Sequence, residues 1–195
     1  MYVGASDSGG DGMMFVLQSD SRKDKAIGET GGNFLAYGGK KDDAMSLSNK
    51  ITPSVGIEFD TWEYPVIGQD DRKELPADHI TVWKDGDMYN PVFGPYPAKA
   101  DESNMEDGTW YYVYVGYDSE RLELTVKINS DSQMFPIGNL LSNGLGEWVY
   151  WGFTSATGDA KNEQKVELPH SLQYGKYFGD VEYSQYDFNR TSWWK

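Results

Sequence analysis

The residues best placed to do chemistry are two carboxylates and a histidine in the second quarter of the chain. Glu58 and Asp60 fall on one face of a predicted strand over 55–62, because side chains two apart on a strand point the same way. His79 opens a second predicted strand over 79–83. The loop between these strands carries four more carboxylates: Asp70, Asp71, Glu74 and Asp78. Such a set, with an imidazole beside it, suits a divalent cation such as Ca²⁺ or Mn²⁺; the alternative is a solvated acidic loop.

The pattern of the whole chain predicts the antiparallel strands that would position these residues. Short alternating runs are separated by turns, and the 22 glycines and 14 tyrosines are typical of an all-β protein. We expect strands at these places: 13–18, 31–39, 55–62, 79–83, 108–117, 121–128, 148–156, 166–168 and 177–188. Residues 88–105 and 129–147 are predicted to be irregular, and no amphipathic helix longer than two turns is evident. Many short strands with glycine-rich turns indicate an antiparallel β-sandwich or jelly roll.

Composition and charge exclude several classes of function. The chain has 195 residues, enough for one domain with a hydrophobic core. A formal net charge of −14 argues against nucleic acid or an anionic membrane as partner, because both require a basic face. The chain has no cysteine and therefore no disulfide framework. No apolar run has membrane length, so we expect no direct membrane insertion, and the oligomeric state stays open.

Six segments, in this order, resemble the legume-type (L-type) lectins, especially their relatives in surface proteins of Gram-positive bacteria. The segments are GGDGMMFVLQ at 9–18, GGNFLAYGG at 31–39, SVGIEFDTW at 54–62, DHITV at 78–82, DGTWYYVYVGYD at 107–118 with LELTV at 122–126, and VYWGFTSATG at 149–158. The resemblance covers about residues 9 to 168. It implies a concanavalin A-like jelly roll of two antiparallel sheets, with a sugar site built by four loops on the concave side.

The resemblance places three of these four loops directly. The first carries Asp11 after a non-proline cis peptide, here Gly10–Asp11, and its carboxylate would accept hydrogen bonds from two sugar hydroxyls. The second supplies a backbone N–H, and Gly32 or Asn33 falls there. The fourth loop follows VYWGFTSATG and offers these candidates: Gly158, Asp159, Ala160 and Lys161.

The third loop of the family binds metal. The resemblance carries over four ligands: Glu58, Asp60, the backbone carbonyl of Trp62, and His79. Where the family usually has an asparagine that serves both calcium and sugar, this chain has Tyr64, which offers no amide oxygen and is kept as a sugar-contact candidate. A further ligand stays undecided among three carboxylates: Asp70, Asp71 and Asp78. The metal site is therefore rebuilt, reduced to one calcium ion, or lost.

The start of the chain departs from the resemblance. Family members have strands before the GDG segment, and here almost nothing precedes it. We expect 1–195 to be a single lectin-like domain, in which divergent C-terminal strands within 169–195 replace the missing ones. The stretch 177–188 would then cover part of the exposed sheet edge, whose backbone donors and acceptors otherwise lack partners. The alternative is that the strands are simply absent.

These features predict a calcium-dependent, non-catalytic carbohydrate-binding module of a secreted or cell-surface bacterial adhesin. Ca²⁺ would act alone or with a second divalent ion such as Mn²⁺. The partner would be a glycan or glycoprotein, and the location extracellular or at the cell surface.

Two alternatives stay open. The segment from Glu58 to Glu63 also resembles the E-x-D-x-x-E signature of family-16 glycoside hydrolases. There Glu58 would be the nucleophile and Glu63 the acid/base, provided that a β-bulge brings both to one face. The third reading is a degenerate sandwich that has lost sugar binding and mediates protein adhesion.

Overall fold

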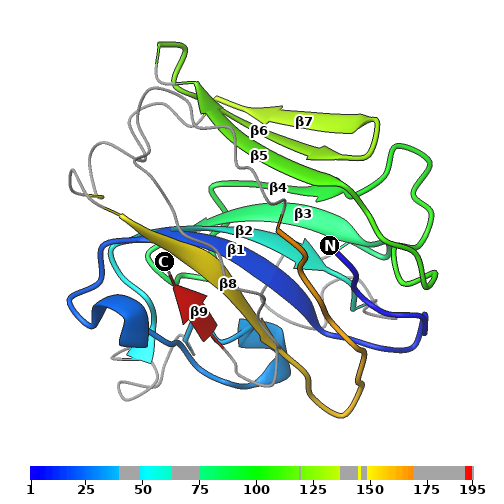
Figure 1. The fold of residues 1–195 in the computed structure, drawn as a ribbon, viewed down its shortest axis with the longest axis horizontal. Coiled ribbons are helices and arrows are strands. Elements are labelled where there is room, and N and C mark those ends of the chain that lie inside the picture. Colours follow the sequence, from blue (N-terminus) through cyan, green and yellow to red (C-terminus); the bar gives the residue numbers. More distant parts are fainter. Residues whose placement is uncertain are drawn as a thin grey trace.

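Two antiparallel sheets form the fold of the computed structural model, which describes residues 1–39, 49–62, 75–118, 120–136, 145, 149–168 and 192–194. The larger sheet has the strand order β4-β3-β2-β1-β8-β9, and the smaller has the order β5-β6-β7 (Figure 1). The strands are β1 Gly12–Gln18, β2 Ser54–Asp60, β3 His79–Lys84, β4 Phe93–Pro97, β5 Val113–Asp118, β6 Glu123–Ile128, β7 Asp131–Phe135, β8 Tyr150–Ala156 and β9 Ser192–Trp194. The predicted all-β antiparallel sandwich is confirmed.

Only two short 3₁₀ turns, η1 (Lys23–Lys25) and η2 (Gly32–Phe34), interrupt the loops among the described elements. No helix in the described ranges has the length and apolarity to cross a membrane.

Strand β1 lies inside the larger sheet and is paired along its whole length on both sides. Its first residue, Gly12, is opposite Asp60 of β2 and Ala156 of β8, and its last, Gln18, is opposite Ser54 and Tyr150. All the named strand pairs are antiparallel, so β1 enters where β2 and β8 end. The segments that flank these three strand ends must therefore lie together.

The main core lies between the two sheets. Ile57, Phe59, Ile80 and Val82 of the larger sheet pack in one buried cluster with residues of the smaller sheet: Leu124, Val126, Ile128 and Phe135. Period-two alternation explains why these residues face the core, because residues two apart along a strand point to the same side of the sheet. The prediction that Ile57 and Phe59 share a face is confirmed.

A second buried cluster covers the opposite face of the larger sheet. Met14, Val16 and Trp83 project from β1 and β3 on this side. The loops cover them with these buried residues: Ala26, Phe34, Leu35, Tyr37, Ile51 and Met88. With both faces covered, every residue of β2 is buried, and its charged residues on this second face are held away from water.

Two predicted strands are wrong. Residues 31–39 form the 3₁₀ turn η2, followed by Leu35 and Ala36 with φ angles of 48° and 56°. Left-handed backbone cannot belong to a strand, so the apolar residues of this stretch cap the second cluster from a turn. Residues 166–168 form no strand, and the nearest pairing is the isolated bridge between Tyr2 and Lys165.

Two strands were missed because their sequences do not alternate clearly. Strand β4 contains Pro95 and Pro97, which read as strand breakers but are tolerated on the edge strand that β4 is. Strand β7 is short and mostly polar, DSQMF, and lies at the edge of the smaller sheet. Strand β9 adds an edge to β8, while the predicted strand at 177–188 lies outside the described residues.

Candidate metal centre and sugar-binding loops

Three predicted metal ligands come together on the second face of the larger sheet. Asp60 of β2 is paired with His79 of β3, and Glu58 lies two residues back on the same face. One ligand atom from each of the three lies within 4.8 Å of the other two. All three residues are buried, Glu58 and His79 to 1% exposure. The alternation of β2 and its register with β3 therefore assemble the triad that the sequence predicts.

Each member of the triad is oriented by a neighbour. Glu58 Oε2 accepts a 2.5 Å hydrogen bond from the indole nitrogen of buried Trp83. Asp60 Oδ1 accepts one of 2.8 Å from the backbone N–H of Trp62. His79 Nδ1 lies 3.0 Å from the carbonyl oxygen of Ala77, which can only accept, so Nδ1 carries the proton.

The orientation of the imidazole suits metal binding. With one proton on Nδ1, His79 turns Nε2 toward the carboxylates, 3.8 Å from Asp60 Oδ2, and in the neutral imidazole this nitrogen offers a lone pair to a metal ion. Two carboxylates and one imidazole nitrogen form a mixed oxygen and nitrogen donor set. Transition ions accept such a set more readily than Ca²⁺, whose protein ligands are oxygens. The residues present therefore fit a divalent metal ion.

The remaining predicted metal ligands lie elsewhere or outside the described residues. Trp62 lies two residues after the end of β2, so its carbonyl is close to the triad along the chain. Asp78 precedes His79, but its Oδ2 accepts the backbone N–H of Met105 and the residue is not part of the triad group. Asp70 and Tyr64 lie outside the described residues, as does Glu63 of the hydrolase reading.

Asp11, the predicted sugar-binding carboxylate, stands at the entrance to β1. The peptide bond between Gly10 and Asp11 is cis, as the resemblance predicts. The Asp11 backbone is tied to both flanking strands: its carbonyl oxygen accepts the N–H of Thr61 at 3.1 Å, and its N–H points to the carbonyl oxygen of Ala156 at 3.4 Å. The end of the central strand thus fixes where this carboxylate lies.

Glycines from two other segments enclose the Asp11 carboxylate. A Cβ atom built on Gly32 would lie 2.1 Å from Asp11 Oδ2, so no other residue fits there without displacing the carboxylate. A Cβ on Gly158 would lie 3.5 Å from the same oxygen and 4.0 Å from the Cα of Gly32. Asn33 is half-buried beside Gly32 in η2, and Asp159 is exposed beside Gly158. Three of the predicted loops therefore meet at one carboxylate.

The metal triad and the Asp11 loop are neighbours. Asp60 is paired with Gly12, the residue that follows Asp11, so Asp11 and Asp60 lie close together at the same end of the sheet. The Trp62 side chain lies against Gly10, where a Cβ would be 3.0 Å from the ring and 3.5 Å from Ala160. Trp62 therefore joins the end of β2, which carries two predicted metal ligands, to the first and fourth of the predicted sugar loops.

This arrangement agrees with the comparison to known families. The family model described as the legume lectin domain matches residues 2–169.

The chain belongs to the legume lectin family.

This match includes the triad, Asp11 and both enclosing glycines, and the sandwich described above is the lectin fold. Legume lectins bind carbohydrate, generally without catalysis, and typically hold metal ions. Within the described part of this lectin domain, Glu58, Asp60 and His79 are the group that could hold a metal ion.

One residue of the lectin domain escaped the sequence reasoning. Glu106 lies between the stretch 88–105, predicted to be irregular, and the predicted strand 108–117, and it is only 3% exposed. Burial raises the pKa of its carboxyl to about 8, and the carboxylates of Asp78 and Asp7 add to the effect. A hydrogen bond from the Asn162 side chain opposes it. Nothing in the local sequence marks Glu106, because its burial comes from segments far away along the chain.

Proposed function

We propose that this lectin domain binds carbohydrate reversibly at the loops around Asp11, and that divalent metal at the neighbouring triad holds the site in shape. The observation that carries the proposal is the convergence of Gly32 and Gly158 on the Asp11 carboxylate, beside Glu58, Asp60 and His79.

The chemistry around Asp11 supports a sugar as the ligand. A carboxylate accepts hydrogen bonds from two adjacent hydroxyl groups, which a pyranose ring presents. Gly32 and Gly158 carry no side chain, so a sugar ring can approach their backbone closely. Asn33 and Asp159 flank these glycines and add polar groups at the rim. A small polar ligand buries little apolar area, so we expect monosaccharide dissociation constants on the order of 1 mM.

We further propose two kinds of metal ligand set. The triad with its imidazole would hold a transition ion such as Mn²⁺, whereas Ca²⁺ would take oxygens such as those of Asp60 and the Trp62 carbonyl. Metal would hold the Glu58, Asp60 and His79 side chains in place before sugar arrives, so that the free energy of ordering them is not subtracted from sugar binding. Asp70 and Tyr64 are retained as candidates in the segment that joins β2 to β3.

The setting of the domain is also part of the proposal. We assign it to the surface-protein branch of the family, as a non-catalytic adhesin module that is secreted or attached to a bacterial cell surface. The acidic chain, with a net charge of −14, supports a neutral glycan or glycoprotein as the partner over any polyanion.

The first experiment removes metal with a chelator and titrates Ca²⁺ and Mn²⁺ back by calorimetry, with thermal melts before and after. We expect binding of both ions, a raised melting temperature, and glycan-array signals that the chelator abolishes. Glu58→Gln should lose metal binding while the exposed control Glu102→Gln keeps it. Asp11→Asn should lose glycan signals with metal binding retained, while Asp24→Asn keeps both.

Other outcomes would redirect the assignment. Absence of metal binding at millimolar concentration would refute the metal-dependent lectin and leave the adhesive sandwich. Glucan hydrolysis that disappears in Glu58→Gln would instead establish the hydrolase.

A further inference from the structure

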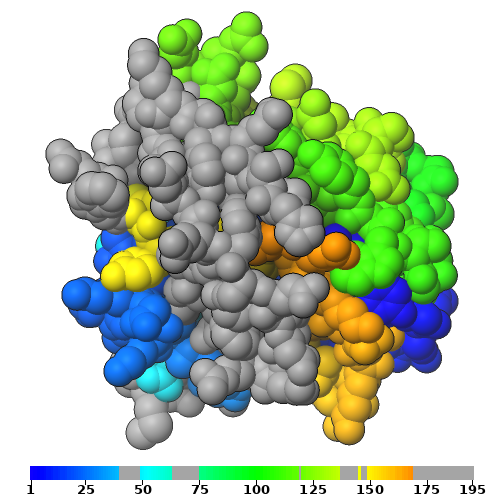
Figure 2. Space-filling view, in the orientation of Figure 1, coloured from blue at the N-terminus to red at the C-terminus, as the bar shows by residue number. Residues whose placement is uncertain are grey.

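The side chain of Asn162, four residues after Gly158, lies at the meeting point of three segments. It contacts residues 4–9 of the segment that leads to Asp11, and it contacts Glu106 of the 104–107 segment. The bridge between Tyr2 and Lys165 continues the same contact, with two backbone hydrogen bonds of 2.8 Å. Figure 2 shows the N-terminal segment and the 157–168 segment next to each other on one face of the molecule.

Two glycines leave the space that this amide occupies. A Cβ on Gly4 would lie 2.1 Å from the side-chain Cγ of Asn162, and a Cβ on Gly9 would lie 2.0 Å from its Nδ2. Neither distance is compatible with a side chain at position 4 or 9. The loop 4–9 is therefore shaped around the Asn162 amide, as well as being bonded to it.

The hydrogen bonds use both ends of the amide. Asn162 Oδ1 accepts the backbone N–H of Ala5 at 3.3 Å, and Nδ2 donates to the carbonyl oxygen of Ser6 at 2.8 Å. Nδ2 also donates to Glu106 Oε1. The Ala5 N–H requires an acceptor, and the Ser6 carbonyl and Glu106 each require a donor. A side-chain amide provides all three, whereas a carboxylate provides acceptors alone.

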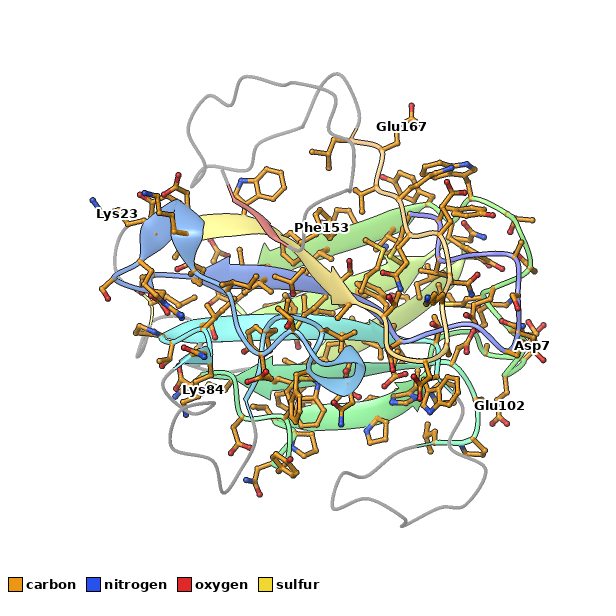
Figure 3. All side chains as sticks on the ribbon, turned by 90° about the horizontal axis from the view of Figure 1, so that it is seen from below. Asp7, Lys23, Lys84, Glu102, Phe153 and Glu167 are labelled. Atoms are coloured by element: carbon orange, nitrogen blue, oxygen red, sulfur yellow. The ribbon has the colours of Figure 1, made fainter. Side chains whose placement is uncertain are left out.

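The third segment reaches the metal centre. Glu106 follows Met105, whose N–H binds the Asp78 carboxylate, and Asp78 directly precedes His79. The Asn104 side chain donates to Asp7 of the N-terminal loop. The 104–107 segment is therefore bonded to that loop directly, as well as through Asn162. In Figure 3, Asp7 and Glu102 lie at the same end of the molecule, opposite Lys23 and Lys84. The 104–107 segment thus backs both Asn162 and the start of β3.

We propose that Asn162 is a positioning residue of the sugar site, which fixes the loop carrying Gly158 and Asp159 against the segment that ends in Asp11. The inference rests on the proposed function. Gly158 lies beside the Asp11 carboxylate just beyond the paired ends of β1 and β8, and the Asn162 amide bonds the continuation of that loop to both the 4–9 loop and the 104–107 segment. Releasing it would let the two halves of the site separate and would weaken sugar binding without removing any sugar contact.

The test compares Asn162→Ala with Asn90→Ala, which loses a hydrogen bond to Asp87 within an exposed turn. Backbone hydrogen exchange of 4–11 and 156–165 is measured on the metal-loaded protein. The probes for binding are the methyl glycosides of glucose, mannose, galactose, N-acetylglucosamine and N-acetylgalactosamine. We expect Asn162→Ala to exchange faster in both segments and to bind the preferred glycoside about tenfold more weakly, while Mn²⁺ affinity is unchanged. Asn90→Ala should match the wild type.

Two exchanges distinguish positioning from general destabilisation. Asn162→Asp places a carboxylate against Glu106 and the Ser6 carbonyl and should weaken binding further. Above pH 8, where the Glu106 carboxyl is ionised, adding Glu106→Gln supplies a donor to the introduced carboxylate and should recover part of the affinity. Gly9→Ala displaces the amide while keeping Asn162, so it should imitate Asn162→Ala, and it should cost less when Asn162 is already alanine.

The outcomes separate this inference from the proposed function. Unchanged exchange and unchanged glycoside affinity in both Asn162→Ala and Gly9→Ala would overturn the positioning role. If no glycoside binds the wild type, the proposed function fails, and the exchange rates alone decide the role of Asn162: faster exchange in both loops supports it and wild-type exchange refutes it.

Discussion

Replacing Trp83 by phenylalanine should weaken metal binding at the triad without touching a ligand. The indole N–H of Trp83 donates a 2.5 Å hydrogen bond to Glu58 Oε2, and both residues are almost fully buried. Phenylalanine keeps most of the ring volume but removes the donor. The Glu58 carboxylate would then lose the group that fixes the direction in which its oxygens point.

The structure sets the expected magnitude. A buried hydrogen bond to a charged group contributes about 1.5–3 kcal/mol, and loss of a residue that orients a metal ligand typically costs about 10- to 100-fold in affinity. These two ranges agree, because each factor of ten is about 1.4 kcal/mol. We therefore expect Mn²⁺ to bind Trp83→Phe about 10- to 100-fold more weakly than the wild type.

The assay is a competition titration of Mn²⁺ against a chelator of known affinity. Trp151→Phe is the matched control, because it removes the same atoms from β8, where the ring contacts Phe15 at a centroid distance of 6.2 Å on the core face. Thermal melts of both metal-free variants report the packing cost separately. Equal Mn²⁺ affinity in Trp83→Phe, Trp151→Phe and the wild type would refute the claim that the indole orients Glu58.

Three further predictions concern other parts of the molecule. Gly32→Ala should abolish glycan binding, because its Cβ would lie 2.1 Å from a carboxylate oxygen, whereas Gly31→Ala meets ordinary contacts of 3.5 Å and should bind normally on a glycan array. Arg22→Lys should lower the free energy of unfolding by about 1–3 kcal/mol in urea titrations, because its guanidinium binds one carboxylate twice and three carbonyl oxygens, while the exposed Arg121→Lys should be neutral. The pKa of Glu106 is raised from 4.5 to about 8, so the folded state holds a proton that the unfolded state has released between these values. Stability of the metal-free protein should therefore fall as pH rises from about 5 to 8, by at most about 1.4 kcal/mol per pH unit, and Glu106→Gln should flatten that dependence; equal slopes for both proteins would contradict it.

The metal triad could be predicted because its geometry is local. Alternation places Glu58 and Asp60 on one face of β2, and antiparallel pairing with the next strand brings His79 opposite Asp60. The cis bond before Asp11 and the meeting of Gly32 with Gly158 followed from resemblance, since the residues are far apart in the chain and no spacing rule connects them.

The features that the sequence did not predict depend on contacts between distant parts of the chain. The stretch 31–39 has the apolar content of a strand, but Leu35 and Ala36 adopt left-handed backbone angles and form a turn. That turn buries its apolar side chains in the second cluster, a tertiary contact that local sequence does not encode. Glu106 and Asn162 are ordinary polar residues whose importance comes from a contact across 56 positions. Burial that depends on such distant contacts leaves no periodic signal in the sequence.

The full pairing of β1 on both sides has a consequence for how this protein could change over time. The carboxylate at its entrance is anchored to an inner strand near the middle of the larger sheet, the part of a sheet that opens last in local unfolding. The loops that face it, around Gly32 and Gly158, add no strand pairing to β1, so their exposed residues, such as Asp159, can be exchanged without disturbing that anchor. One fixed acceptor with replaceable surroundings is a ready starting point for engineering new glycan preferences, by grafting loops at two places and leaving Asp11 and the triad intact.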